Sequence, residues 1–186
     1  MPHLYLKSNF YQRVTANKLI LILSCYFVVV FNLTFLLKTY NAVLLLDNYN
    51  LLFLLSIPVL LLNILLIFFS VFSVKYLLKP ALIIFTFISG LMTYATFSYG
   101  IVFDYGMIEN TVETSSSEAF SYLNVNAFLI VAALSVLPIM YLYKVKLTFS
   151  PLRTELIQRL KLLSLSTLSF FIIAFFFYGD YASVGR

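Results

Sequence analysis

Histidine, cysteine and tryptophan are nearly missing from this sequence of 186 residues. It has one histidine (His3), one cysteine (Cys25) and no tryptophan. A single cysteine cannot form a disulfide within the chain, and neither residue has the closely spaced partners that a zinc site requires. A glycine-rich phosphate-binding loop is missing as well. These absences exclude a disulfide-stabilised fold and leave the chain without a catalytic or metal-binding residue set of its own.

Charged residues are also scarce, at 10% of the chain, whereas hydrophobic residues make up 62% and the mean hydropathy is +1.00. Soluble domains contain about 45–50% apolar residues. A chain of this length cannot bury so much apolar surface in a water-soluble core, so the composition indicates an integral membrane protein. The net charge of +5 does not indicate a nucleic-acid partner, because the basic residues cluster at the ends of apolar runs.

Five apolar runs are long enough to cross a bilayer, which needs about 20 helical residues. They predict an all-α membrane protein, one transmembrane domain over residues 1–186, with spans at about 19–37, 51–74, 81–102, 122–143 and 160–178. Asn32 and Asn63 lie inside the first two spans, where amides are expected to bond between helices. Gly90 and its small neighbours in the third span are expected to let another helix approach closely.

The distribution of lysine and arginine predicts the orientation of these spans. The side that holds the N-terminus carries ten basic residues: Lys7, Arg13, Lys18, Lys75, Lys79, Lys144, Lys146, Arg153, Arg159 and Lys161. The opposite side carries two, Lys38 and Arg186. Since loops rich in lysine and arginine stay in the cytoplasm, we expect a cytoplasmic N-terminus. The C-terminus and the connection between spans three and four are then expected on the outer side.

The connection before the fifth span carries a helix signal. Ser150 and Pro151 are typical of an N-cap and of the first helical residue, respectively. Glu155 and Arg159 are spaced to form an ion pair across one helical turn. The sequence therefore predicts an interfacial helical turn that runs directly into the fifth span.

The connection between spans three and four, Asp104–Ser121, is the least apolar stretch of the chain. It holds four of the seven acidic residues and neither lysine nor arginine. Asn110, Thr114 and Glu118 recur every four residues, which on a continuous helix places an amide, a hydroxyl and a carboxylate on one face. A polar triad between hydrophobic spans is a candidate ligand site.

Local capping explains the same residues without a ligand. Ser115–Glu118 fits the capping box, with Ser115 starting the helix that becomes the fourth span. Three consecutive serines also favour a helix break at this point. The other acids of the stretch are interpreted as solvated side chains without a metal.

Residues Met107–Ala119 resemble the loop after the third span in the lipid A phosphoethanolamine transferases, a family that includes the mobile colistin-resistance enzymes. The family pattern is Met-Ile-x-Asn-x-x-x-Thr-(Asp)-x-x-Glu-Ala, and this chain has its Asn, Thr and Glu at positions 110, 114 and 118. The segment Asp180–Arg186 is similar to the start of the family's connection to its outer domain. Ser115 differs from the pattern, since aspartate is common there.

The resemblance implies a fold and an activity for a longer protein. A periplasmic, sulfatase- or alkaline-phosphatase-like catalytic domain with a zinc-bound threonine nucleophile would follow residue 186. The enzyme would move phosphoethanolamine from phosphatidylethanolamine, the donor, to lipid A, the acceptor, in the bacterial inner membrane, a change associated with polymyxin resistance. The present chain would be the membrane anchor, inactive alone.

The resemblance also implies a role for the triad, which is binding of the donor headgroup by Asn110, Thr114 and Glu118. Amide and hydroxyl groups can donate to a phosphodiester, and a carboxylate suits an ethanolamine ammonium. A non-enzymatic five-helix membrane scaffold or lipid-binding protein is also compatible with the sequence. The transferase and scaffold interpretations differ in whether the gene continues past residue 186 into a domain with metal ligands.

Overall fold

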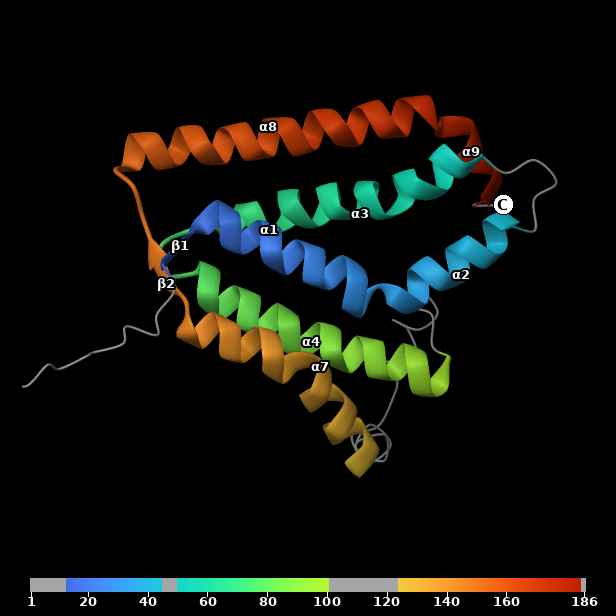
Figure 1. The fold of residues 1–186 in the computed structure, drawn as a ribbon, viewed down its shortest axis with the longest axis horizontal. Helices are drawn as coiled ribbons and strands as arrows, with labels where there is room; N and C mark the ends of the chain where they lie inside the picture. The colour runs from blue at the N-terminus through green and yellow to red at the C-terminus, as the bar shows by residue number, and fades with distance from the viewer. Residues whose placement is uncertain (1–12, 45–49, 101–123, 185–186) are drawn as a thin grey trace, which may run out of the picture.

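The computed structural model describes residues 13–44, 50–100 and 124–184, and most of these are helical (Figure 1). The helices are α1 (Ala16–Tyr26), a short π-helix η1 (Phe27–Phe31), α2 (Leu33–Leu44), α3 (Leu51–Val71), α4 (Leu78–Tyr99), α7 (Val125–Lys144), α8 (Leu152–Phe176) and α9 (Tyr178–Val184). Two strands of three residues, β1 (Arg13–Thr15) and β2 (Lys146–Thr148), pair with each other at one end of the bundle.

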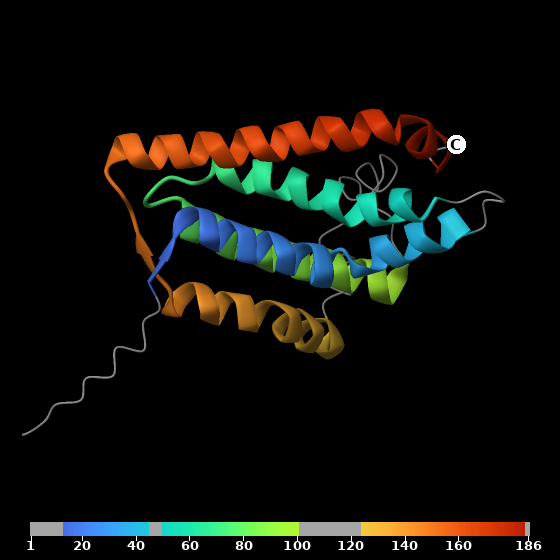
Figure 2. The same ribbon diagram turned by 45° about the horizontal axis from the view of Figure 1, so that its top comes forward.

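The long helices lie side by side, with α1 near the middle and α8 and α7 on opposite sides (Figures 1 and 2). α3 packs against both α1 and α8, and α4 packs against α7. The main core cluster joins α1, η1, α3 and α4 through buried side chains that include Leu19, Phe27, Phe69 and Leu82. The rings of Phe27 and Phe69 meet edge to face with 5.0 Å between their centroids. The first span is therefore the centre of the packing.

Within the described residues, four helices, α3, α4, α7 and α8, are long and apolar enough to cross a membrane. The segment Ala16–Phe31 and α2 pass the same test together but are bent by 61° at their junction, so they add a fifth span if the bent pair counts as one. These features agree with a mostly helical, multi-pass membrane domain. α8 is long because the helical turn expected ahead of the fifth span continues into it from Leu152 without a break.

The bend between η1 and α2 is produced by Asn32. Both its backbone N–H and its side-chain amide donate to the carbonyl of Phe27 at 3.0 Å, five residues earlier, which is π-helical spacing. Thr93 of α4 donates to the carbonyl of Phe31 at 3.2 Å. The expectation that Asn32 bonds between helices is wrong, because its side-chain amide donates to a carbonyl of its own helical segment.

Asn63, the other amide inside a span, bonds between helices as expected. Its side chain donates to Ser169 Oγ of α8 at 2.9 Å. Polar contacts of this kind hold helices together where lipid surrounds them, since the hydrophobic effect offers little preference for helix over lipid. The contact matters for α8 because only a small share of its span, 6% of the residues in its apolar window, is buried within the bundle.

Pro138 interrupts the hydrogen bonding of α7. It has no N–H, so the carbonyl of Leu134, four residues earlier, loses its helical partner. Tyr26 Oη, at the end of α1, donates to that carbonyl at 2.6 Å. α7 bends along its length (Figure 1), as an interior proline produces. A tyrosine of the central helix therefore satisfies the carbonyl released at the bend.

The paired strands were missed by the all-α prediction. β1 and β2 are parallel, with Val14 opposite Leu147 in the middle of the pair. Lys79 Nζ donates to the carbonyl of Val145 beside β2. The pairing ties the chain before α1 to the connection between α7 and α8, which are distant in sequence. Three residues a strand are too few for the alternating pattern that predicts strands.

The start of α8 confirms one expectation and corrects another. Glu155 and Arg159 form the expected ion pair, with 2.8 Å between Oε1 and Nη2. The N-cap is Pro151, without a side-chain capping bond, and the first helical residue is Leu152. The predicted cap at Ser150 is therefore wrong by one position. Such shifts at helix ends follow from competing local bonds that sequence patterns do not resolve.

Candidate functional site

The predicted triad, Asn110, Thr114 and Glu118, lies outside the described residues. The structure does describe the two helix ends to which that stretch is joined, Tyr99 of α4 and Val125 of α7. We call this end of the α4–α7 pair the loop end. It lies away from the paired strands, which adjoin the start of α1 and the end of α7 (Figure 1).

Gly100 ends α4 in a left-handed conformation, with φ of +64°. A side chain at this position would have space, because an added Cβ would meet no heavy atom within 4 Å. The backbone conformation, rather than crowding, is therefore what favours glycine here. The expected end of the third span, at about residue 102, lies just beyond this glycine.

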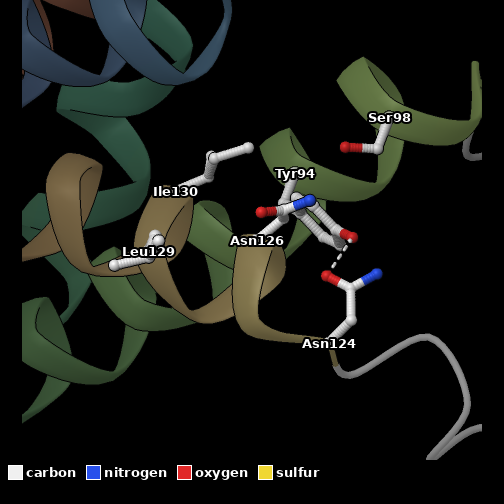
Figure 3. A pocket seen from close by; sticks show the side chains of 6 residues that line it. All are labelled: Tyr94, Ser98, Asn124, Asn126, Leu129 and Ile130. Carbon is white, nitrogen blue, oxygen red and sulfur yellow. Dashed lines mark hydrogen bonds between the residues drawn. The ribbon is translucent and has the colours of Figure 1, made fainter.

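Asn124 starts α7 and joins it to α4. Its Oδ1 accepts from the backbone N–H of Ala127 at 2.8 Å, which makes it the N-cap. The same oxygen accepts from Tyr94 Oη of α4 at 3.2 Å (Figure 3). Ser115 is therefore not the cap of this helix, contrary to the capping interpretation, because α7 begins after Asn124.

A groove of about 470 Å³ lies between α4 and α7 at the loop end. Its lining residues come from both helices and from the cap: Tyr94, Ser98, Asn124, Asn126, Leu129 and Ile130 (Figure 3). Four of the six carry a neutral group that can form hydrogen bonds, and the other two are aliphatic. None of the described lining residues is charged.

Two polar groups of the groove are available to a ligand. Within the part of the chain that the structure describes, the side chains of Ser98 and Asn126 have no hydrogen-bond partner, and both residues are exposed. Ser98 lies one turn beyond Tyr94 on α4, and Asn126 lines the same groove from α7 (Figure 3). The groove therefore presents a hydroxyl and an amide from two different helices.

Small residues hold α4 against α7 below the groove. Ser135 of α7 donates to the carbonyl of Thr86 at 3.3 Å. A Cβ on Gly90 would collide with Ser135 Oγ and would lie 3.4 Å from Val131 Cγ1. The close approach expected at Gly90 is therefore present, and α7 is the neighbour.

A second, smaller pocket of about 230 Å³ lies between α2 and α3. Its lining is mostly aliphatic: Leu36, Leu37, Tyr40, Leu54, Ile57 and Pro58. Nearby, Tyr181 of α9 and Ser56 of α3 share a hydrogen bond of 2.8 Å. Burial raises the pKa of Tyr181, partly offset by that bond, so its phenol stays neutral.

The sequence patterns did not single out the groove residues. The available signal was Asn124 and Asn126 directly before an apolar run, which is typical of a helix N-cap. Pairing with Tyr94 required the fold. Among residues 13–44, 50–100 and 124–184, no three His, Cys, Asp or Glu side chains gather as a possible metal site.

The family model of the phosphoethanolamine transferases EptA/EptB matches residues 60–186 of this chain. Phosphatidylethanolamine transferase Mcr-2 of Escherichia coli is 28% identical over 133 residues, covering 72% of this chain and 25% of that protein. Phosphoethanolamine transferase EptA of Escherichia coli strain K12 is 28% identical over 169 residues, covering 90% of this chain and 31% of that protein. The chain thus spans less than a third of the length of these relatives.

A solved structure agrees with these matches. The integral membrane lipooligosaccharide phosphoethanolamine transferase A (EptA) of Neisseria meningitidis has a TM-score of 0.82 to this chain at 27% identity. The similarity covers 92% of this chain and 32% of that one. Together, the family match and the shared bundle show that the chain belongs to the EptA/EptB phosphoethanolamine transferase family and corresponds to its N-terminal membrane domain.

Proposed function

We propose that this chain is the membrane domain of a longer enzyme that moves phosphoethanolamine from phosphatidylethanolamine to lipid A. The observation that carries the proposal is the similarity of the bundle, over 92% of the chain, to the transferase from Neisseria meningitidis. In that reading the domain anchors a catalytic domain beyond residue 186 and offers it the lipid donor. The catalytic domain would hold the zinc and the nucleophile that the resemblance implies.

The donor headgroup is proposed to bind at Asn110, Thr114 and Glu118. Charge supports this choice of ligand, because Asp104–Ser121 has four acids and no lysine or arginine. Such a stretch would bind an isolated anion poorly, whereas a zwitterionic headgroup brings an ammonium for the carboxylate. Tyr99 and Val125, the described helix ends on either side of that stretch in the sequence, belong to the two helices that form the α4–α7 groove.

The loop end is proposed to face the periplasm of the bacterial inner membrane. Basic residues support this orientation: Arg13 and Lys146 pair within the strands, and Lys79 contacts the adjoining Val145, all at the opposite end of the bundle. Lysine and arginine concentrate on the cytoplasmic side of membrane proteins. The strand end is therefore the cytoplasmic one in this proposal.

Cysteine labelling tests the orientation. In a variant without the single native cysteine, Cys25, an impermeant thiol reagent should label Ser116→Cys once the outer membrane is permeabilised, and should spare Arg153→Cys. Disruption of the inner membrane should then expose Arg153→Cys, which controls for reactivity. Labelling of Arg153→Cys alone in cells with an intact inner membrane would invert the orientation.

Expression of the gene extended past residue 186 tests the activity. Mass spectrometry of lipid A should find added phosphoethanolamine in cells that make the extended protein, together with polymyxin protection. Cells that make residues 1–186 alone should lack the modification. With a single histidine and a single cysteine, these residues lack a nucleophile and metal-ligand set for the transfer. An extended protein that folds, inserts and leaves lipid A unmodified would favour a non-enzymatic scaffold.

A further inference from the structure

The α4–α7 groove changes from polar to apolar along its length. Ser98, Asn124 and Asn126 lie at its loop end, whereas Leu129 and Ile130 lie further along α7 (Figure 3). Its volume, about 470 Å³, falls within the range of about 300–1,000 Å³ that small-molecule sites occupy. Such a lining suits an amphiphile, with its polar part toward the loop end and its chain along α7.

The polar part of the groove lies at a shallow depth. Ser98 is next to the last residue of α4, and Asn126 is the second residue of α7. A helix rises about 1.5 Å per residue, so both are within a few ångströms of a helix end. Bilayers are about 40–45 Å thick overall around a hydrocarbon core of about 30 Å, which leaves a thin interfacial layer on each side. The ester linkages of phospholipids join headgroup to chain in that layer.

The chemistry of the lining selects neutral groups of the lipid. Ser98 and Asn126 are uncharged and can donate hydrogen bonds, and the amide nitrogen of Asn124 is a third donor, since its oxygen is engaged by Tyr94 and Ala127. An ester carbonyl is a neutral acceptor. A phosphate or an ammonium would be bound more strongly by charged partners, and the described lining has none.

We propose that this groove binds the glycerol ester region of a diacyl phospholipid, with an acyl chain lying along Leu129 and Ile130. The inference rests on the proposed function in one respect, which is that the donor lipid is the occupant during transfer. The groove would then hold the part of the donor that is not transferred. The triad would hold the headgroup, which is transferred.

Tryptophan fluorescence gives a direct test, because the chain has no tryptophan. In a protein limited to residues 1–186, Leu129→Trp places the only indole at the groove. Phe171→Trp places it instead on the exposed face of α8, away from the groove. The protein is reconstituted in vesicles of diether phosphatidylglycerol, which has no ester carbonyls. Brominated guest lipids, which quench tryptophan, are then added with either ester or ether linkages.

We expect the brominated diester phosphatidylglycerol to quench Leu129→Trp more strongly than its diether analogue, with a preference of about two- to tenfold in apparent affinity. This is what one neutral hydrogen bond provides. Phe171→Trp should be quenched equally by both guests. Adding Asn126→Leu to Leu129→Trp should lower the ester preference, because one of the three donors is lost. Asn41→Leu, the same change at an exposed position of α2, should leave the preference unchanged.

Equal quenching of Leu129→Trp by ester and ether guests would overturn the proposal, whichever headgroup they carry. Guests with an ethanolamine headgroup separate this result from the proposed function. The diester preference can hold while phosphatidylethanolamine quenches no more strongly than phosphatidylglycerol. That result would support the lipid site in the groove and contradict the proposed headgroup site. Stronger quenching by phosphatidylethanolamine, equal for ester and ether guests, would support the headgroup site and contradict the proposed lipid site in the groove.

Discussion

Glu118→Gln in the extended transferase should lower phosphoethanolamine transfer about tenfold or more. A hydrogen bond to a charged group contributes about 1.5–3 kcal/mol, and about 1.4 kcal/mol corresponds to a factor of ten. Glutamine keeps the size of the side chain but removes the charge that would pair with the donor's ammonium. In steady-state kinetics the loss should appear as a weaker apparent affinity for the donor lipid. Glu118→Ala should weaken that affinity only slightly more than Glu118→Gln does.

A purely structural role for Glu118, as in a capping box that does not begin α7, predicts a different outcome for the same variant. Glutamine serves in a capping box nearly as well as glutamate, so a purely structural Glu118 would leave transfer near the unmodified level. Asn110→Ala and Thr114→Ala should reduce affinity less, since neutral hydrogen bonds contribute about 0.5–1.5 kcal/mol. Glu113→Gln in the same stretch is the matched control. Wild-type transfer and polymyxin protection with Glu118→Gln would remove the headgroup site.

Features set by local composition were predictable from the sequence. The apolar runs predicted the long helices α3, α4, α7 and α8, because hydrophobic length alone marks a helix that can cross lipid. Asn63 was correctly expected to bond between helices, since a buried amide within a membrane span gains most from a polar partner on a neighbouring helix. Gly90 was likewise correct, because the absence of a side chain is a local property with a direct packing consequence.

Features that depend on a second segment were not predictable. Asn32 shares its residue type and its apolar surroundings with Asn63, yet its side-chain amide donates to the carbonyl of Phe27 in the same helical segment. The pairing of Val14 with Leu147 joins short segments that carry no strand pattern. The groove requires both Tyr94 of α4 and Asn124 at the start of α7, and the sequence of neither segment predicts that they contact each other.

The bend of α7 links the site to the centre of the bundle. Tyr26 of α1 donates to Leu134, the carbonyl that Pro138 leaves without a helical partner. The same part of α7 packs closely against α4, where Ser135 lies against Gly90 and donates to the carbonyl of Thr86. The loop-end half of α7, which carries Asn126 and Leu129, is therefore positioned by contacts near residues 134 and 135. A change there should alter both the stability of the bundle and the groove.

Replacing Gly90 should reduce the stability of the bundle in proportion to the size of the new side chain. Its Cβ would collide with Ser135 Oγ, which can move only by giving up its bond to Thr86. Overpacking costs about 1–3 kcal/mol, so we expect about 1 kcal/mol for Gly90→Ala and about 3 kcal/mol for Gly90→Leu. Unfolding in mixed micelles of mild and denaturing detergent measures the free energy.

Ser135→Ala should rescue Gly90→Ala but not Gly90→Leu. Removing the hydroxyl leaves Val131 Cγ1 at 3.4 Å as the nearest remaining contact of the added Cβ, an ordinary separation. Contacting residues show coupling energies of about 0.5–3 kcal/mol in a double-mutant cycle, and this pair should fall within that range.

Gly179→Ala is the matched control, because an added Cβ there meets nothing within 4 Å. Alanine is favoured over glycine in a helix by roughly 0.5–1 kcal/mol, so the control should be neutral or slightly stabilising. An additive cycle would mean that α4 and α7 are not in contact at Gly90, and the groove above them would lose its support.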